Sequence, residues 1–507
     1  MSSLKYKDWK LPNYRNTKVI DTIGEVDITA EDVLLASQFA GQSVLIVGHS
    51  EKGKSFYMKE VLDNHYGGNG LYLDPSDLGA SADLISSIFY KLDKAEARSK
   101  IDENQIEVAF MGINELGTLP KEIQSSLYNL GDGVLRDRGK SFYVGVPSNG
   151  TKYLFFVAAT NQLREEDNGD YANFGTTTPI VSRFGITLDL RALKRSEEDM
   201  FVIRESLKDE GSSGSRHQEA KKIDLTDQII KEYKSIRESA RDQPLEFEVV
   251  WNYLVHGMAK CKQGEKMEGI WHNKCLECSH EYGSDALGSD DAAADAAADA
   301  AAAGNVAAEN NANSAGCPNK FFYMYEMMRL ENNFPLFVAA LERVARIKKP
   351  RAKLDLYDLV FTAAKLMLPG KFHMLNYSLL MQEYEGIDSM MVKKGIEVAR
   401  THFNLIKPYI ERTIDCYKNY GEIVDKFIRK DDGTLLPYTK RFFRQMITAD
   451  PKVNALDDDK LDKVMNGFVS KYSLTQPYEN DWVDMSWLKK FLKFKTKIAK
   501  TESKSKT

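Results

Sequence analysis

An octapeptide at residues 48–55 has the residue types and spacing of a phosphate-binding loop, Gly-His-Ser-Glu-Lys-Gly-Lys-Ser. It follows an apolar run at residues 44–47 and precedes a helical pattern that begins with Phe56. In such a loop, glycines let backbone N–H groups turn toward phosphate oxygens, and the next helix adds the positive end of its dipole. We expect Lys54 to reach the β and γ phosphates and Ser55 to ligate Mg²⁺; the alternative is a chance Gly-Lys-Ser turn. The predicted nucleotide contacts are Gly48, His49, Ser50, Glu51, Lys52, Gly53, Lys54, Ser55 and Phe56.

A second apolar run, at residues 108–113, ends in polar residues that could serve the metal and the attacking water. The chain has Asn114 where a carboxylate would offset the charge of Mg²⁺, although an amide can still accept a hydrogen bond from a metal-bound water. Glu115 is the candidate base for the water. Asp74, after the run at residues 71–73, is a fallback acidic group. The alternative for this segment is a core strand followed by a surface glutamate.

Two later polar residues complete the predicted catalytic set. Asn161 follows an apolar run at residues 155–159 and could orient the attacking water. Arg183 precedes another run and could act on the γ-phosphate of a neighbouring subunit, where such an arginine raises the rate about 10³–10⁵-fold. Taken singly, each is more often a turn residue or a surface ion pair. Their order after the loop leads us to predict four catalytic residues, Glu115, Asn161, Arg183 and Asn114.

The elements that must position these residues alternate between short apolar runs and helix-like stretches, as in α/β proteins. We therefore expect an α/β nucleotide-binding domain with a parallel sheet at residues 31–190. Its strands are predicted at residues 43–47, 70–73, 107–113, 153–159 and 185–190.

The strand signal is weak outside this domain. Residues 1–30 are polar and mixed, which predicts an irregular lead-in. Helical periodicity takes over after residue 190, so we expect a helical lid at residues 191–370 and a helical C-terminal region at residues 371–507. Residues 284–316 are low in complexity, with an Asp-Ala-Ala-Ala repeat and no apolar face to bury, which predicts a mobile insertion in the lid.

In these motifs and their order, the sequence resembles the MoxR-like branch of AAA+ ATPases. The resemblance covers residues 31–190 well and extends more loosely to about residue 368. It implies a P-loop AAA+ core, a ring that is usually a hexamer with ATP at subunit boundaries, and chaperone-like remodelling of a protein client, often one with a von Willebrand factor A domain. The segments that carry it are residues 74–78, 114–125, 159–161, 178–184 and 341–364.

Two positions depart from the pattern of that family. Where the family has Ser-Pro-Arg, this chain has Phe334-Pro335-Leu336, so the sensor-2 arginine is missing unless Arg343 or Arg346 replaces it. The usual Gly-Pro segment before the acidic strand is replaced by a charged stretch at residues 90–105. Together with Asn114, these departures suit a divergent member with an altered client or slow hydrolysis.

Four of the five cysteines lie close together in the chain, which favours metal binding in a reducing compartment. Four thiolates suit tetrahedral Zn²⁺, and His272 or His280 could replace one of them. Free buried thiols and an iron–sulfur cluster are the alternatives. On the zinc interpretation the metal holds the base of the insertion at residues 261–317. The predicted ligands are Cys261, Cys275, Cys278 and Cys317.

Bulk composition limits the partners. The net charge is −5, and no apolar run approaches the length needed to cross a bilayer, so we expect neither a membrane nor nucleic acid as partner. The N-terminus shows no signal peptide, which predicts a cytoplasmic protein. The Lys-rich tail from Lys489 is read as a solvated, frayed end rather than as a binding segment.

These residues are compatible with three functions. The first is an ATPase that couples hydrolysis, with Mg²⁺, to remodelling a protein partner. The second is a nucleotide-gated scaffold with little or no hydrolysis, which Asn114 and the missing sensor-2 arginine favour. The third, a DNA-associated module using the cysteine cluster, is disfavoured by the acidic net charge. We predict the ATPase.

Overall fold

The computed structural model describes part of the 507-residue chain, and it divides into two compact units. The described residues are 5–11, 18–49, 53–68, 70–74, 104–119, 121–127, 129–137, 139–148, 151–161, 178–181, 183–191, 223–241, 243–254, 321–323, 328–371, 374–375, 377–420, 491 and 495. The first unit comprises Met1–Gln243 and Met324–Lys394, and the second comprises Pro244–Tyr323 and Gly395–Thr507. The domain boundaries expected at residues 30, 190 and 370 stay predictions.

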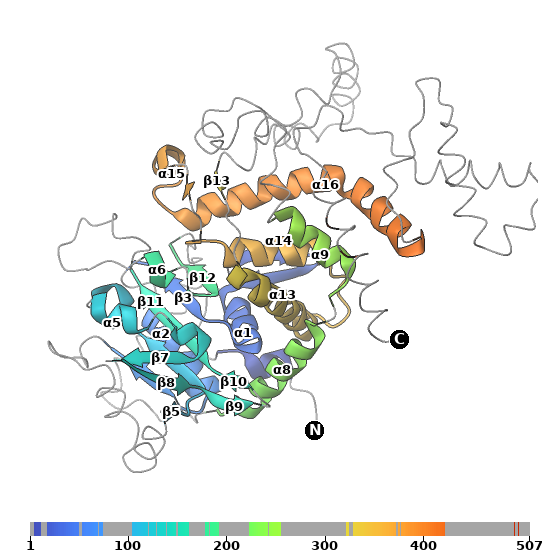
Figure 1. Ribbon diagram of the computed structural model, residues 1–507. Helices are drawn as coiled ribbons and strands as arrows, with labels where there is room; N and C mark the ends of the chain where they lie inside the picture. The colour runs from blue at the N-terminus through green and yellow to red at the C-terminus, as the bar shows by residue number, and fades with distance from the viewer. Residues whose placement is uncertain are drawn as a thin grey trace, which may run out of the picture. The chain divides into compact units, whose positions relative to one another are not determined.

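A five-stranded parallel sheet forms the centre of the first unit (Figure 1). Its spatial order is β12-β3-β11-β6-β4. Every residue of β3, β6, β11 and β12 is buried, which explains why β3, β6 and β11 read as largely apolar runs rather than as alternating ones. The predicted parallel sheet and its five strands are thus confirmed. The observed strands are β3 (Val44–Val47), β4 (Leu71–Leu73), β6 (Phe110–Ile113), β11 (Phe155–Thr160) and β12 (Ile186–Asp189).

The register of the sheet brings the carboxyl ends of its five strands to one edge. Thr160 and Asp189 are both paired with Val47, and Leu73 is paired with Ile113. The residues that follow these strands therefore leave the sheet side by side. In open α/β sheets, this edge is where ligands bind.

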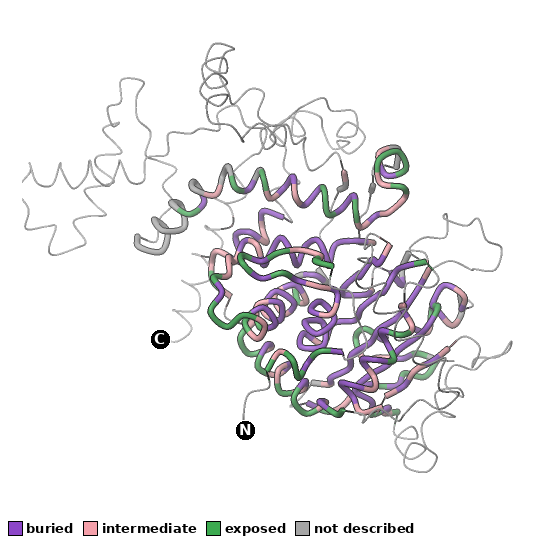
Figure 2. Tube along the Cα trace, turned by 180° about the vertical axis from the view of Figure 1, so that it is seen from behind, coloured by how far each residue is buried: buried purple, intermediate pink, exposed green. Residues whose placement is uncertain are grey.

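Helices pack around the sheet. Figure 2 shows that the chain of the first unit is largely buried where these elements pack together. Helix α1 packs against α8 and α13, and α14 packs against β12. A capping box between Thr29 and Asp32 starts α1, and Gly41, at φ 62°, ends it in the left-handed conformation that favours glycine. These helices are α1 (Ala30–Ala40), α2 (Lys54–His65), α8 (Thr226–Ser239), α13 (Met328–Lys348) and α14 (Leu356–Met367).

Part of the predicted irregular lead-in is a β-hairpin, so the prediction was wrong for residues 19–29. Strands β1 (Val19–Ile23) and β2 (Val26–Thr29) pair antiparallel around a two-residue turn. Gly24 has a φ of 57° there, and a Cβ on it would lie 2.3 Å from the carbonyl oxygen of Lys353. The buried residues of β2 alternate with more exposed ones. The alternation extends over only four residues, which gives a weak signal in the sequence.

Further short strands lie between the predicted ones. The pairs β7–β8 and β9–β10 are antiparallel hairpins that precede β11, and β5 pairs with β8. The remaining described elements of the first unit include three short helices and three 3₁₀ turns. They are η1 (Tyr6–Trp9), β5 (Gln105–Ile106), η3 (Leu116–Thr118), α5 (Lys121–Ser126), η4 (Leu130–Asp132), β7 (Val134–Asp137), β8 (Lys140–Val144), β9 (Val146–Ser148), β10 (Thr151–Tyr153), α6 (Thr178–Val181), β14 (Met374–Leu375) and α15 (Tyr377–Glu383).

The second unit is mainly helical where it is described. It contains α9 (Leu245–Asn252), β13 (Phe322–Tyr323) and most of α16 (Asp388–Tyr420), which begins in the first unit. The hydroxyl of Tyr253 donates to the carbonyl of Ala399 at 3.0 Å, and its ring packs against Phe403. No helix among the described residues is long and apolar enough to cross a membrane. The low-complexity segment at residues 284–316 lies outside the described residues.

Candidate functional site

The loop after β3 leads into the first turn of α2, as its sequence predicts. Its start is held by a hydrogen bond from the backbone N–H of Gly48 to the carbonyl of Thr160, at 3.1 Å. Gly53, at φ 79°, occupies the N-cap position of α2 in the left-handed conformation. This geometry places Lys54 and Ser55 in the first helical turn. The predicted contacts Ser50, Glu51 and Lys52 lie outside the described residues.

The ammonium group of Lys54 is enclosed by oxygen atoms. Its Nζ donates to the carbonyls of Gly48 and His49, at 2.7 and 2.9 Å, and to Oδ1 of Asn161, at 2.7 Å. These acceptors match the three N–H donors of a lysine. Only 6% of the residue is exposed. Burial lowers the pKa of Lys54 below its usual range, and the charge of Glu115 acts in the opposite direction.

A second chain of hydrogen bonds links Ser55 with the ends of β6 and β4. The hydroxyl of Ser55 donates to Oδ1 of Asn114 at 2.7 Å, and Nδ2 of Asn114 donates to Oδ2 of Asp74 at 3.0 Å. The side chain of Asn114 has its two polar atoms occupied and is largely buried. These three residues offer hydroxyl, amide and carboxylate oxygens, the donor types that Mg²⁺ prefers.

Glu115 follows Asn114 in an unusual backbone conformation. Its φ of 46° and ψ of 52° lie in the left-handed region, where a residue with a Cβ costs free energy. The conformation is held by Thr118, whose backbone N–H and hydroxyl both donate to the carbonyl of Glu115. The side chain of Glu115 is exposed. A strained backbone of this kind is common at functional sites, where it aims one side chain.

The contacts of Arg183 include the turn that contains Asn129. Its Nη1 donates to Oδ1 of Asn129 at 2.9 Å, and its backbone N–H donates to the carbonyl of Ile180. The structure therefore brings together Lys54, Ser55, Asn114 and Asn161, with Glu115 close enough to act on the lysine through its charge. Phe56, the last predicted contact of the loop, is 45% exposed.

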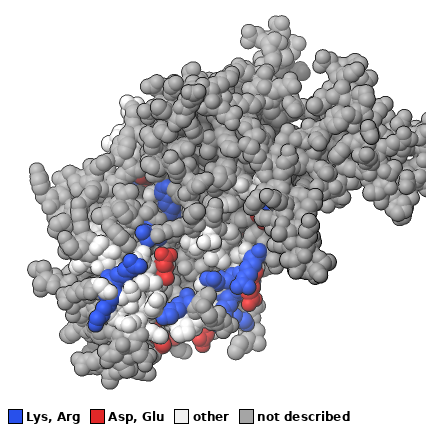
Figure 3. All heavy atoms as spheres, viewed as in Figure 1, with Lys and Arg blue, Asp and Glu red and all other residues white. Residues whose placement is uncertain are grey.

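The two arginines considered as sensor-2 substitutes pair with glutamates. Arg343 forms a bidentate ion pair with Glu232, and Arg346 pairs with Glu342 one helical turn away. On the face seen in Figure 3, basic side chains of the described residues lie among acidic ones rather than in one basic surface.

The predicted zinc ligands Cys261, Cys275, Cys278 and Cys317 lie outside the described residues. Within the described ranges, no group of three or more His, Cys, Asp or Glu residues could hold a metal ion.

Two contacts of the site had little or no signal in the sequence. The sequence offers Asp74 only as a fallback group, because nothing in the chain order shows that β4 and β6 are neighbours. That adjacency puts its carboxylate on Asn114. Asn129, the partner of Arg183, lies in a turn that no apolar pattern marks.

The fold and the site define an α/β protein with a parallel sheet, compatible with the core of a P-loop ATPase. The chain matches no protein-family model and no curated protein. It is similar to a solved structure from Cytophaga hutchinsonii, described as that of a "putative ATPase", with 13% sequence identity and a TM-score of 0.38. The match covers 72% of this chain and 87% of that one. A likeness at this level carries no argument about chemistry, which depends on the contacts described above.

Proposed function

We propose that this chain binds ATP with Mg²⁺ at residues 48–56 and hydrolyses it. The observation that carries the proposal is the meeting of Lys54 and Ser55, in the first turn of α2, with Asn161 and Asn114 at the ends of β11 and β6. A lysine and a hydroxyl at a helix N-terminus, facing polar strand ends, form a site suited to a phosphate and its cation.

Each side chain has a chemical task in this proposal. A phosphate oxygen would replace one of the three oxygen acceptors of Lys54. It would then lie beside the buried charge of the ammonium group, where electrostatic attraction is stronger than in water. Ser55 would hold Mg²⁺ through its hydroxyl oxygen, next to Asn114. When bound, Mg²⁺ would supply charge neutralisation to the phosphates.

Hydrolysis would use the two polar residues beyond the phosphate loop. Glu115 would take the proton of the attacking water. Its left-handed backbone conformation sets the direction in which the side chain leaves the main chain. Asn161 would orient the water while its Oδ1 stays on Lys54. Both positions leave the same edge of the sheet.

We further propose that the chain is a divergent MoxR-like AAA+ ATPase, a ring-forming and cytoplasmic one that remodels a protein client. The order of the loop, Asn114–Glu115, Asn161 and Arg183 supports this type. Arg183 would act on the γ-phosphate of the neighbouring subunit, and its bond to Asn129 would hold the guanidinium group in place. A client with a von Willebrand factor A domain and a structural Zn²⁺ on the cysteine cluster belong to the same proposal.

A nucleotide-gated scaffold with little or no hydrolysis is the second candidate. It is favoured by Asn114, because a neutral amide gives Mg²⁺ less charge compensation than a carboxylate would.

Steady-state ATP hydrolysis separates the two candidates. We expect turnover by the wild type, and losses of at least about 10²-fold in Glu115→Gln and Arg183→Ala, because each removes a group used only in the transition state. Lys231→Ala, which removes an exposed charge on α8, should keep wild-type turnover and serves as the control. Tight nucleotide binding without turnover in the wild type would instead establish the scaffold.

A further inference from the structure

We infer that Asp74 is a positioning residue of the proposed Mg²⁺ site: through its hydrogen bond with Asn114 it keeps the Ser55 hydroxyl oriented toward the cation and supplies the negative charge that Asn114 lacks. The inference rests on the proposed function. The negative charge beside the cation would then come from Asp74 at the end of β4, whereas the sequence pattern would place it at the end of β6.

The orientation of the Asn114 amide follows from its two neighbours. A carboxylate only accepts hydrogen bonds, so the group that faces Asp74 must be the NH₂ of the amide. Oδ1 of Asn114 then faces Ser55, whose hydroxyl hydrogen it accepts at 2.7 Å. One amide orientation alone satisfies both bonds.

This orientation leaves the lone pairs of the Ser55 oxygen available. A hydroxyl has one hydrogen and two acceptor lone pairs, and its hydrogen is committed to Asn114. Without Asp74, the amide could turn over and present its NH₂ group to Ser55. That hydroxyl would then accept a bond on a lone pair that a cation needs.

The sheet fixes the relative positions of the two strand ends. The backbone N–H of Asn114 donates to the carbonyl of Leu73 at 2.9 Å, which extends the β4–β6 pairing by one residue. Asn114 is only 8% exposed, so water competes little for its amide. The contact with Asp74 therefore lies one residue beyond the paired ends of the two strands.

The same geometry explains why position 114 carries an amide. A carboxylate at Asn114 would stand about 3 Å from that of Asp74, and two like charges at this distance repel each other strongly. An amide beside one carboxylate avoids this repulsion and gives both polar atoms of the Asn114 side chain a partner.

Equilibrium binding of a fluorescent ATP analogue, with excess Mg²⁺ and with EDTA, tests the inference. We expect Mg²⁺ to tighten binding to the wild type, and Asp74→Asn to lose about tenfold or more of that gain, because removal of a residue that orients a metal ligand costs about 10–100-fold in metal affinity. Exchanging the pair, Asp74→Asn with Asn114→Asp, restores one carboxylate beside one amide and should recover most of the loss. Asp227→Asn, the same change at an exposed position on α8, is the control and should bind like the wild type.

The outcomes separate the inference from the proposed function. If the wild type binds no nucleotide, or binds equally well in Mg²⁺ and in EDTA, the proposed Mg²⁺-ATP site is wrong and the inference fails with it. If the wild type responds to Mg²⁺ and Asp74→Asn responds equally, the proposed function stands and the inference is overturned. Circular dichroism of each variant shows that it is folded, and the exchanged pair supplies the decisive comparison where Asp74→Asn alone does not fold.

Discussion

The Nζ atom of Lys54 lies 2.7 Å from Oδ1 of Asn161, although 107 positions separate the two residues in the chain. Their contact depends on β3 and β11 being neighbours in the sheet, so that the residues that follow them emerge together. A phosphate bound to Lys54 would therefore lie next to the amide that could orient an attacking water.

Replacing Asn161 by alanine should slow hydrolysis more than it weakens binding. We expect a loss of about 10²-fold or more in single-turnover rate, because a group that positions a reactant contributes mainly to the transition state. The affinity for nucleotide should change by less than about tenfold, since Lys54 keeps its two carbonyl acceptors. Equal losses in rate and affinity would show that Asn161 supports the loop rather than the chemistry.

Mixing two inactive variants should restore hydrolysis if Arg183 acts across a subunit boundary. Glu115→Gln subunits keep Arg183, and Arg183→Ala subunits keep Glu115. In an equal mixture, about a quarter of the interfaces in a ring would combine an intact Glu115 with an intact neighbouring Arg183. ATP turnover after exchange of subunits checks this. A mixture as inactive as its components would place Arg183 outside the site of a neighbour.

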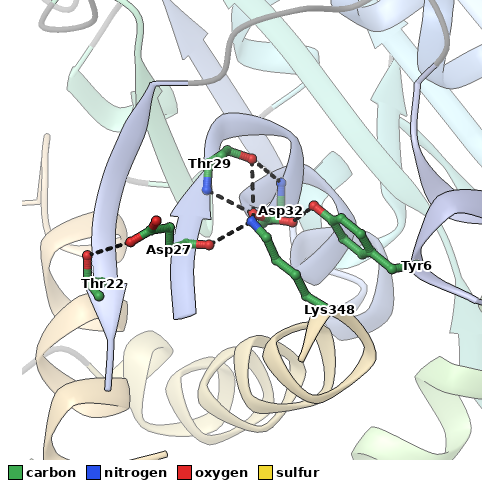
Figure 4. Close-up of polar contacts among 6 residues, drawn as sticks. All are labelled: Tyr6, Thr22, Asp27, Thr29, Asp32 and Lys348. Carbon is green, nitrogen blue, oxygen red and sulfur yellow. Dashed lines mark hydrogen bonds and ion pairs between the residues drawn. The ribbon is translucent and has the colours of Figure 1, made fainter. Parts of the chain in front are cut away.

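Lys348→Ala should destabilise the first unit more than Lys349→Ala does. Figure 4 shows Lys348 and Tyr6 converging on Asp32, whose carboxylate is 1% exposed and accepts from Lys348 at 2.7 Å. Removing the lysine leaves a buried charge without its counter-ion, a change that costs about 3 kcal/mol or more. Lys349 pairs with Glu25 at an exposed position, and such pairs contribute less than about 1 kcal/mol.

The thermal midpoints of the two lysine variants provide the measurement, with circular dichroism at neutral pH. Equal midpoints would contradict the assignment of Asp32 as a buried, charge-paired residue.

The contribution of His65 to the stability of the first unit should be lost in acid. Burial lowers the pKa of this residue to about 4, although its hydrogen bond with the carbonyl of Trp9 acts in the opposite direction. The unfolded chain binds the proton near pH 6.5 and the folded chain only near pH 4, so the contribution of His65 is complete above pH 6.5 and is lost as the pH falls toward 4. The shift corresponds to about 3 kcal/mol.

Comparison with His65→Gln isolates this effect. Glu31 has its pKa raised to about 7 by burial, so it titrates over an overlapping range with the opposite sign, but it is present in both proteins. The difference in unfolding midpoint between the wild type and His65→Gln should therefore favour the wild type near pH 7 and shrink or reverse near pH 4. A difference that does not change with pH would mean that His65 is not buried in its neutral form.

Residues whose roles depend on local pattern could be predicted from the sequence. Most strands of the parallel sheet are short, largely apolar runs, and the glycines and Lys54 of the loop stand at a fixed spacing after the first of them. The contact of Lys54 with Asn161 could be expected only once a sheet order was assumed. The β1–β2 hairpin does not stand out in the sequence because polar residues interrupt its strands, which are only partly buried.

Asp74 and Asn129 could not be placed from the sequence, because their contacts depend on the three-dimensional arrangement of distant segments. Asp74 meets Asn114 because β4 lies beside β6, and Asn129 meets Arg183 across 54 positions of the chain. Neither relationship leaves a periodic or spaced pattern of residues.

The most direct test of the central claim is the equilibrium affinity of the purified protein for ATP with Mg²⁺, measured by calorimetry for the wild type and for Lys54→Ala. We predict saturable binding by the wild type and a loss of at least about 10²-fold in the variant, because the variant removes the only buried cation that the described part of the site directs at the phosphates. Equal affinity in the two proteins, or no binding by a folded wild type, would contradict the claim that residues 48–56 form a nucleotide site.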